Sequence, residues 1–82
     1  MVFRKVAEIL AEILEVDCEM ITKETALTAE YGIKAIDVAK LVIECEKKFK
    51  ITILDEEVHR LRNVDDLVEY IKRVQSDRWS SY

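Results

Sequence analysis

Three side chains in this sequence have the reactivity that catalysis or metal binding needs: His59, Cys18 and Cys45. A thiolate nucleophile requires a base beside it, and a zinc site requires several ligands at short spacing. Neither cysteine has a base partner near it in sequence, and His59 has no cysteine or carboxylate at metal-ligand spacing. A Cys–His pair could form only in space, and nothing in the sequence points to one. We therefore expect a surface or partly buried His59, a core Cys45 and an exposed Cys18, with no catalytic residue and no metal.

A different kind of site is indicated by the segment YGIKAID, residues 31–37, which holds the only glycine of the chain. An apolar-periodic stretch that is typical of a long helix follows it directly. A loop that turns into a helix at a glycine is suited to presenting a group to a partner. The residue at the expected helix start is Ala35, whose methyl group can do no chemistry.

The composition limits the fold class and the function classes that are possible for this chain. Eighty-two residues make one small domain, and 50% hydrophobic and 37% charged residues with no proline and one glycine favour an all-α globular fold. The net charge of -4 argues against binding to a nucleic-acid backbone, which requires a clustered positive face. No apolar run approaches the roughly 18 residues of a membrane span, and no secretory segment is visible. We expect a cytoplasmic protein with reduced thiols.

Apolar residues recur at three- and four-residue spacing in three stretches, which predict helices over residues 2–15, 35–49 and 64–74. In the first and third, the inward stripes are Phe3, Val6, Leu10, Ile13 and Leu14, and Val64, Leu67, Val68, Ile71 and Val74. In the second, the expected inward residues are Ile36, Ala39, Val42, Ile43 and Phe49, widened by Val38, Leu41 and Cys45. We expect Asn63 to cap the helix over residues 64–74.

The remaining segments are predicted as connections. Residues 16–33 lose the helical period and collect threonines, so we expect a long loop that Val16, Ile21 and Leu27 attach to the core. Ile51 and Ile53 alternate as in a strand, but the run is too short and has no partner strand. We interpret it as a loop leading into a short helix over residues 55–60. The predicted domain covers residues 1–75, and residues 76–82 are predicted to form a flexible C-terminal tail.

This arrangement, three longer helices and a short one with a loop-to-helix junction at Gly32, resembles the acyl carrier protein family from Val6 to Ile71. In that family the second helix opens with Gly-x-Asp-Ser-Leu-Asp, and the serine carries 4′-phosphopantetheine, an arm whose thiol holds acyl groups as thioesters. Gly32 and Asp37 match this pattern, and Ile36 replaces the leucine conservatively. Lys34 stands where the aspartate is expected, and Ala35 stands where the serine is expected. The resemblance implies an up-down bundle of three main helices plus a short third helix.

The resemblance also implies a function, which Ala35 blocks. The protein would be a non-catalytic carrier of acyl or aminoacyl thioesters for a fatty-acid, lipid or polyketide pathway. A methyl group offers no oxygen for the phosphodiester, so no arm can be attached to Ala35 and this chain would be fixed in its apo form. Because Gly32, Ile36 and Asp37 still fit the pattern around Ala35, we favour an engineered replacement of a serine of the parent protein. The alternative is a natural, arm-less protein-interaction module that docks through the same surface.

The resemblance to the family also implies a docking surface, a site for the acyl chain and a set of partner enzymes. Docking onto partner enzymes would use the second helix, whose charged residues Asp37, Lys40, Glu44, Lys47 and Lys48 are of mixed sign. Lys34 also reverses a family charge, so we expect a specialised pathway rather than the standard partners of fatty acid synthesis. An acyl chain would be sheltered at Ile36, Ala39, Val42 and Ile43. The expected partners are a phosphopantetheinyl transferase and the synthases, ligases or transferases of the pathway, acting on a monomer.

Overall fold

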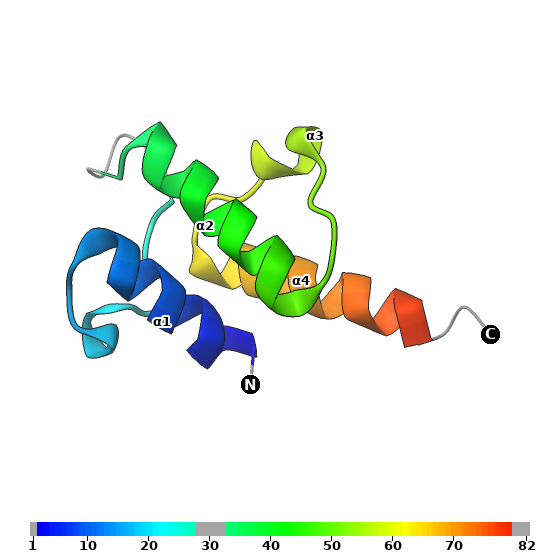
Figure 1. Ribbon diagram of the computed structural model, residues 1–82, viewed down its shortest axis with the longest axis horizontal. Coiled ribbons are helices and arrows are strands. Elements are labelled where there is room, and N and C mark those ends of the chain that lie inside the picture. The colour runs from blue at the N-terminus through cyan, green and yellow to red at the C-terminus, as the bar shows by residue number, and fades with distance from the viewer. Residues whose placement is uncertain (1, 28–32, 80–82) are drawn as a thin grey trace.

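The computed structural model describes residues 2–27 and 33–79, and within these residues it is a bundle of helices without a strand. The helices are α1 (Val2–Leu14), the short 3-10 turn η1 (Cys18–Met20), α2 (Ala35–Phe49), α3 (Asp55–Val58) and α4 (Val64–Trp79). Figure 1 shows α1 and α2 running side by side in opposite directions, with α4 passing behind α2 and α3 on the side of α2 away from α1. Helix α1 contacts both α2 and α4. The predicted all-α bundle is therefore confirmed.

The apolar periodicity of α1 explains its central place. Val6, Ala7, Leu10 and Ala11 are buried, and this spacing places them on one face of the helix. The residue that follows the helix, Glu15, has a left-handed backbone with φ of 56°. The Val16 N–H then donates to the Ala11 carbonyl at 3.0 Å, which satisfies a carbonyl that the helix end would leave open.

Helix α2 begins and ends at the predicted residues, Ala35 and Phe49, but it presents a different face to the core. The buried residues are Leu41, Val42, Cys45 and Phe49. Ile36, Ala39 and Ile43, which we expected to point inward, are exposed, Ile36 by 60% and Ile43 by 49%. The pattern of α2 is apolar on more than half of its circumference, so periodicity alone could not define which part faces α1 and α4.

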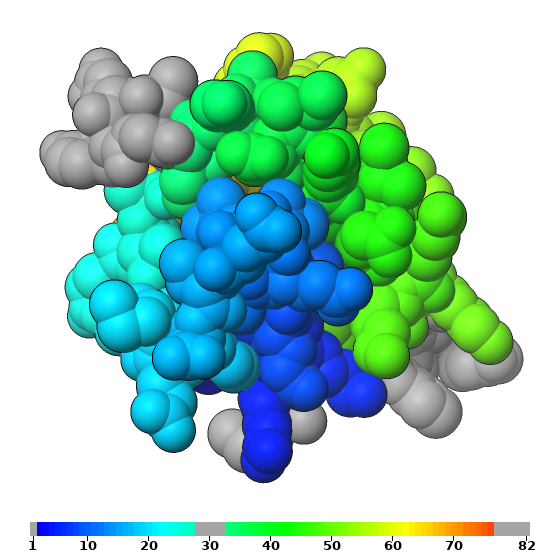
Figure 2. All heavy atoms as spheres, turned by 60° about the vertical axis from the view of Figure 1, so that its left-hand side comes forward, coloured from blue at the N-terminus to red at the C-terminus, as the bar shows by residue number. Residues whose placement is uncertain are grey.

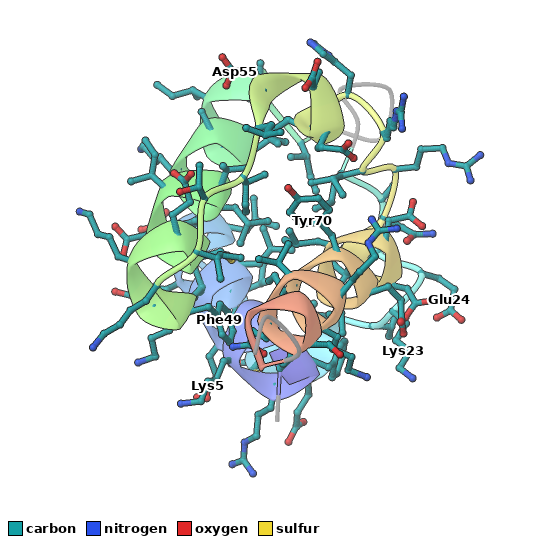
Figure 3. The ribbon with its side chains drawn as sticks, turned by 90° about the vertical axis from the view of Figure 1, so that its right-hand side faces the viewer. Lys5, Lys23, Glu24, Phe49, Asp55 and Tyr70 are labelled. Carbon is teal, nitrogen blue, oxygen red and sulfur yellow. The ribbon has the colours of Figure 1, made fainter. Side chains whose placement is uncertain are left out.

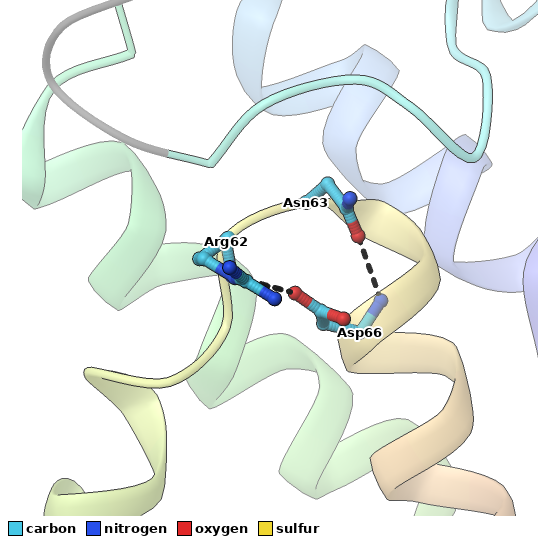
Figure 4. A network of polar contacts seen from close by, with 3 residues as sticks. All are labelled: Arg62, Asn63 and Asp66. Atoms are coloured by element: carbon cyan, nitrogen blue, oxygen red, sulfur yellow. Dashed lines mark hydrogen bonds and ion pairs between the residues drawn. The ribbon is translucent and has the colours of Figure 1, made fainter.

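Helix α4 begins where its cap was predicted. The Asn63 side-chain oxygen accepts a hydrogen bond from the Asp66 N–H at 2.9 Å, and Asp66 in turn accepts one from the Arg62 N–H at 3.0 Å. Figure 4 shows these three residues around the first turn. The bond to Asn63 occupies an N–H group that a helix start leaves without an intrahelical partner, and the Arg62 bond attaches the preceding residue to the first turn. The other end of α4 differs from the prediction, because the helix continues past Val74 to Trp79.

The first loop is attached to the start of α4 through its backbone. The Leu27 N–H donates to the Arg62 carbonyl at 2.8 Å, and Ala26 forms an isolated bridge with Asn63. In the other direction, the N–H groups of Val64 and Asp65 donate to the carbonyls of Thr25 and Lys23 at 2.9 and 3.0 Å. Ile21 and Leu27 are buried, as predicted, but Val16 is 43% exposed. The prediction for Val16 is wrong because the turn after α1 directs it away from the core.

The connection between α2 and α3 is a loop, as predicted, and its residues alternate between buried and exposed positions. Ile51 and Ile53 are buried and Thr52 between them is exposed. The short helix ends at Val58 rather than Arg60. Figure 3 shows Phe49 and Tyr70 directed toward the interior between α2 and α4, while Lys5, Lys23, Glu24 and Asp55 project outward.

Candidate functional site

The start of α2 is the point at which the sequence predicted a presented group. Ile33 is buried, Lys34 has an extended backbone, and Ala35 is the first residue of the helix. The Lys34 N–H donates to Asp37 Oδ2 at 3.4 Å, and the Lys34 carbonyl accepts from the Asp37 N–H at 3.0 Å. Gly32, the first residue of the predicted motif, lies outside the described residues. The buried Ile33 and these two bonds hold Ala35 at the surface.

The Ala35 side chain itself cannot carry a phosphodiester-linked group, although its position is accessible. The side chain is exposed, so a partner could reach it. A methyl group has no lone pair to attack phosphorus and no proton to lose, and the described neighbours from Ile33 to Val38 contain no hydroxyl group. No linkage chemistry can therefore take place at position 35 in this sequence.

A cavity of about 500 Å³ lies between α2 and α3. Its apolar lining comes from α2, from the loop that follows α2, and from α3. Three charged or polar side chains, Glu46, Asp55 and His59, complete the lining. The apolar residues that line the cavity are Ala39, Val42, Ile43, Ile53 and Val58. A concave, mostly apolar site with few polar groups is the usual form of a site for a small apolar ligand.

Three of the four residues predicted to shelter an acyl chain line this cavity: Ala39, Val42 and Ile43. The fourth, Ile36, does not line it and is exposed one turn before Ala39. Five cavity residues were not part of the predicted site: Glu46, Ile53, Asp55, Val58 and His59. The last four depend on how the chain after α2 folds back over it, and the sequence has no periodic signal for that contact.

The cavity is bounded by a hydrogen bond that sequence reasoning also missed. Glu46 Oε2 accepts from the Ile53 N–H at 2.9 Å in a part-buried position. The bond connects the last turns of α2 to the loop that leads into α3. Because the cavity lies between these same elements, the bond helps to fix its shape.

The charged residues predicted for docking are spread around the exposed side of α2. Lys40, Glu44, Lys47 and Lys48 are exposed, and Asp37 is half-buried against the helix start. Lys47 and Glu44 form an ion pair at 3.9 Å. Lys40 lies at the edge of a second hollow, between α1 and α2, that Ile9, Ile13 and three carboxylates also line. Figure 2 shows this side of the molecule, with α1 in blue packed against α2 in green.

The reactive side chains do not come together. Cys45 is buried and Cys18 exposed, and both are free thiols. Burial, with a smaller contribution from the Glu44 carboxylate, raises the pKa of Cys45 from 9.0 to about 12, so this thiol is not a nucleophile at neutral pH. His59 is exposed at the cavity. Within residues 2–27 and 33–79, no group of three or more potential metal ligands occurs.

The described helices include none that is both long and apolar enough to cross a membrane. Residues 4–71 match the family model described as a phosphopantetheine attachment site. The chain is 38% identical over 73 residues to an acyl carrier protein of Phytoplasma mali, covering 89% of this chain and 87% of that protein. It is 36% identical over 70 residues to an acyl carrier protein of Helicobacter pylori, covering 85% and 90%.

The fold is also similar to a solved structure. The acyl carrier protein from Enterococcus faecalis superposes with a TM-score of 0.73 at 26% identity, over 89% of this chain and 92% of that one. The likeness extends over the whole helical bundle. Sequence and fold therefore point to the same group of proteins.

Proposed function

Because the chain belongs to the phosphopantetheine-attachment family of acyl carrier proteins, whose prosthetic group is 4′-phosphopantetheine, we propose that position 35 is its attachment position and that Ala35 blocks it. The role of the family is to carry acyl groups. One observation carries the proposal: Ala35 is the exposed first residue of α2, directly after the buried Ile33, in a chain that matches the family from residue 4 to 71. A serine at this position would present its hydroxyl to solvent.

The cavity between α2 and α3 supports a carrier of apolar groups. Its lining by Ala39, Val42 and Ile43 from one side and Ile53 and Val58 from the other would remove an acyl chain from water. The polar Glu46, Asp55 and His59 would remain near the thioester end or at the edge. In the serine-containing parent, the carried group is an acyl or aminoacyl thioester of a fatty-acid, lipid or polyketide type pathway.

The protein performs no reaction of its own in this proposal. It is a cytoplasmic monomer that is modified by a phosphopantetheinyl transferase. It then binds in turn to synthases, ligases or transferases. The mixed charge of α2 supports a specialised pathway, because charge at a docking surface selects partners and sets association rates. With Ala35 in place, the chain is inert as a carrier and still has its docking surface.

A second candidate function follows from Ala35 itself. A protein that never carries an arm could use α2 and the adjoining cavity only to bind a partner. In that case Ala35 is the natural residue, and partner binding is the whole function. The two candidates differ in whether a hydroxyl at position 35 is sufficient for modification.

The deciding experiment compares this chain with Ala35→Ser by intact-protein mass after incubation with coenzyme A and a broad-specificity phosphopantetheinyl transferase. We expect the serine variant alone to gain the mass of one arm. Ile36→Ser is the matched control, since it places a hydroxyl at the next exposed position and should gain nothing. A folded Ala35→Ser that stays unmodified would contradict the carrier proposal and favour the arm-less module.

A further inference from the structure

Helix α1 carries its charges in the order that opposes a helix dipole. Acidic side chains stabilise the start of a helix and basic ones its end, and α2 follows this rule with an acidic first turn and a basic last turn. In α1, Arg4 and Lys5 occupy the first turn, which has no acidic residue, and Glu12 lies in the last turn, which has no basic one. Local helix stability therefore explains the charges of α2 but not those of α1.

The packing of the helices brings the cations of α1 to the basic ends of the other helices. Helices α1 and α2 are in contact and run in opposite directions, so the first turn of α1 lies beside the last turn of α2 (Figure 1). The second half of α4 runs toward the same end of the molecule, and Figure 3 looks onto this end, with Lys5 labelled. Four cations from three helices are found there: Arg4, Lys5, Lys48 and Lys72. We call these four residues the basic end.

The protein itself does not neutralise the basic end. All four side chains are exposed, and none forms an ion pair within the described parts of the chain. Four carboxylates belong to the same helix segments: Glu8, Glu44, Glu46 and Glu69. Two of them are engaged elsewhere, since Glu44 pairs with Lys47 at 3.9 Å and Glu46 accepts the Ile53 N–H at 2.9 Å. Gathering unpaired like charges costs electrostatic energy, so this arrangement is better explained by an anionic partner than by stability.

We propose that the basic end binds the anionic headgroups of a lipid bilayer. Its cations come from three helices and form a broad face, which suits a plane of negative charge. Val2 and Phe3 lie in the same first turn of α1 and are only half-buried, so they can make apolar contact at the headgroup level. A nucleic-acid backbone would offer these two side chains no such contact. A bilayer is therefore the partner that fits both the cations and the apolar residues.

Binding in this orientation would leave position 35 free. Ala35 begins α2 and the basic end lies at the other end of that helix, about 20 Å away at about 1.5 Å per residue. The chain would then present position 35 away from the bilayer. The proposal goes beyond the proposed function and holds with or without an arm at that position.

The net charge of -4 sets the salt dependence of this binding. The Debye length is about 10 Å at 0.1 M salt, so a bilayer at the basic end is largely screened from carboxylates at the other end, such as Glu12 and Asp37. At about 0.01 M salt it is roughly 30 Å, and these carboxylates repel the bilayer. We expect the strongest binding near 0.1 M salt and weaker binding at about 0.01 M and about 1 M.

The test measures co-sedimentation of the unaltered chain with vesicles of phosphatidylglycerol and phosphatidylcholine in equal parts. We expect binding to these vesicles and not to phosphatidylcholine alone, and Lys5→Glu should weaken it about tenfold. Lys23→Glu is the matched control, because Lys23 is also exposed but its backbone is bonded to the start of α4. It should change binding by less than about twofold.

The fold of Lys5→Glu is checked by unfolding in urea. The substitution places a carboxylate in the first turn of α1, where the helix dipole favours it, so the free energy of unfolding should not fall. Lost lipid binding with retained stability would therefore identify a binding role of Lys5. Lost binding together with lost stability would contradict that role.

Several other outcomes would overturn the inference. They are equal binding to both kinds of vesicle, no binding to phosphatidylglycerol at any of the three salt concentrations, or equal losses in Lys5→Glu and Lys23→Glu. Tighter binding to polyuridylic acid than to vesicles, lost in Lys5→Glu, would assign the basic end to nucleic acid. Self-association that is lost in Lys5→Glu, measured by sedimentation, would assign it to the acidic side of a second copy. None of these results depends on whether Ala35→Ser is modified.

Discussion

The Glu46 carboxylate of α2 accepts a hydrogen bond from the backbone N–H of Ile53 at 2.9 Å, across the loop that leads to α3. Glu46→Ala would leave this part-buried N–H without its partner. We expect a loss of about 1–2 kcal/mol in the free energy of unfolding, measured in urea. Glu46→Gln keeps an acceptor and should lose less.

Glu44→Ala is the matched control for this change, since it removes a carboxylate from an exposed ion pair on the same helix. Its effect should stay below about 0.5 kcal/mol. Faster hydrogen exchange at the Ile53 amide in Glu46→Ala, but not in Glu44→Ala, would locate the effect at the loop. Equal losses in the two variants would show that the bond contributes nothing beyond the charge.

The cap of α4 gives a second prediction. Asn63→Ala removes the acceptor of the Asp66 N–H and should lower the free energy of unfolding by about 1 kcal/mol. Asn63→Asp should retain most of the stability, because its carboxylate can accept the same bond at the positive end of the helix dipole. Arg62→Ala, which breaks only an exposed ion pair with Asp66 at 3.7 Å, should have little effect. A stable Asn63→Ala would mean that water replaces the cap at no cost.

The left-handed residue after α1 gives a third prediction. Glu15 has φ of 56°, where a side chain with a Cβ atom is strained and glycine is not. Glu15→Gly should raise the free energy of unfolding by about 0.5–1 kcal/mol. Glu12→Gly makes the same chemical change within the helix and should lower it by about 1 kcal/mol. If both variants are destabilised alike, the conformation at Glu15 costs nothing.

The buried thiol of Cys45 predicts a dependence of stability on pH. Its pKa is raised from 9.0 to about 12 in the folded protein, so folding favours the protonated thiol. The stabilisation is fully present below pH 9 and is lost as the pH rises toward 12, because the unfolded thiol ionises first. The difference in unfolding free energy between this chain and Cys45→Ala should therefore shrink across that range. Cys18→Ser, at an exposed position, should follow the unaltered chain.

The sequence predicted the elements of this fold better than their orientation. The bounds of α2 and the cap at Asn63 follow from periodicity and local hydrogen bonding, which act within a few residues. The exposure of Ile36, Ala39 and Ile43 depends on where α1 and α4 lie, and that information is spread over the whole chain. Helix α4 continues to Trp79, although the apolar period ends at Val74. The division into a domain over residues 1–75 and a tail stays a prediction.

The candidate site shows the same division between local and distant information. Ala35, Lys34 and Asp37 could be singled out because they form one short motif. The cavity could be predicted only on its α2 side, through Ala39, Val42 and Ile43. Asp55 and His59 line it because the chain after α2 folds back and places α3 beside that helix. The hydrogen bond from Ile53 to Glu46 has no signature in the residue types, because almost any backbone N–H can be the donor.

The backbone bonds between residues 23–27 and 62–65 have a consequence for synthesis on the ribosome. The first loop is complete early, but the groups that bind it, around Arg62, Val64 and Asp65, emerge almost forty residues later. Until then the carbonyls of Lys23 and Thr25 can be satisfied only by water or by temporary partners. The first loop therefore cannot form its final backbone hydrogen bonds during translation before the start of α4 has left the exit tunnel. Folding of this loop is completed only when the carboxy-terminal helix is available.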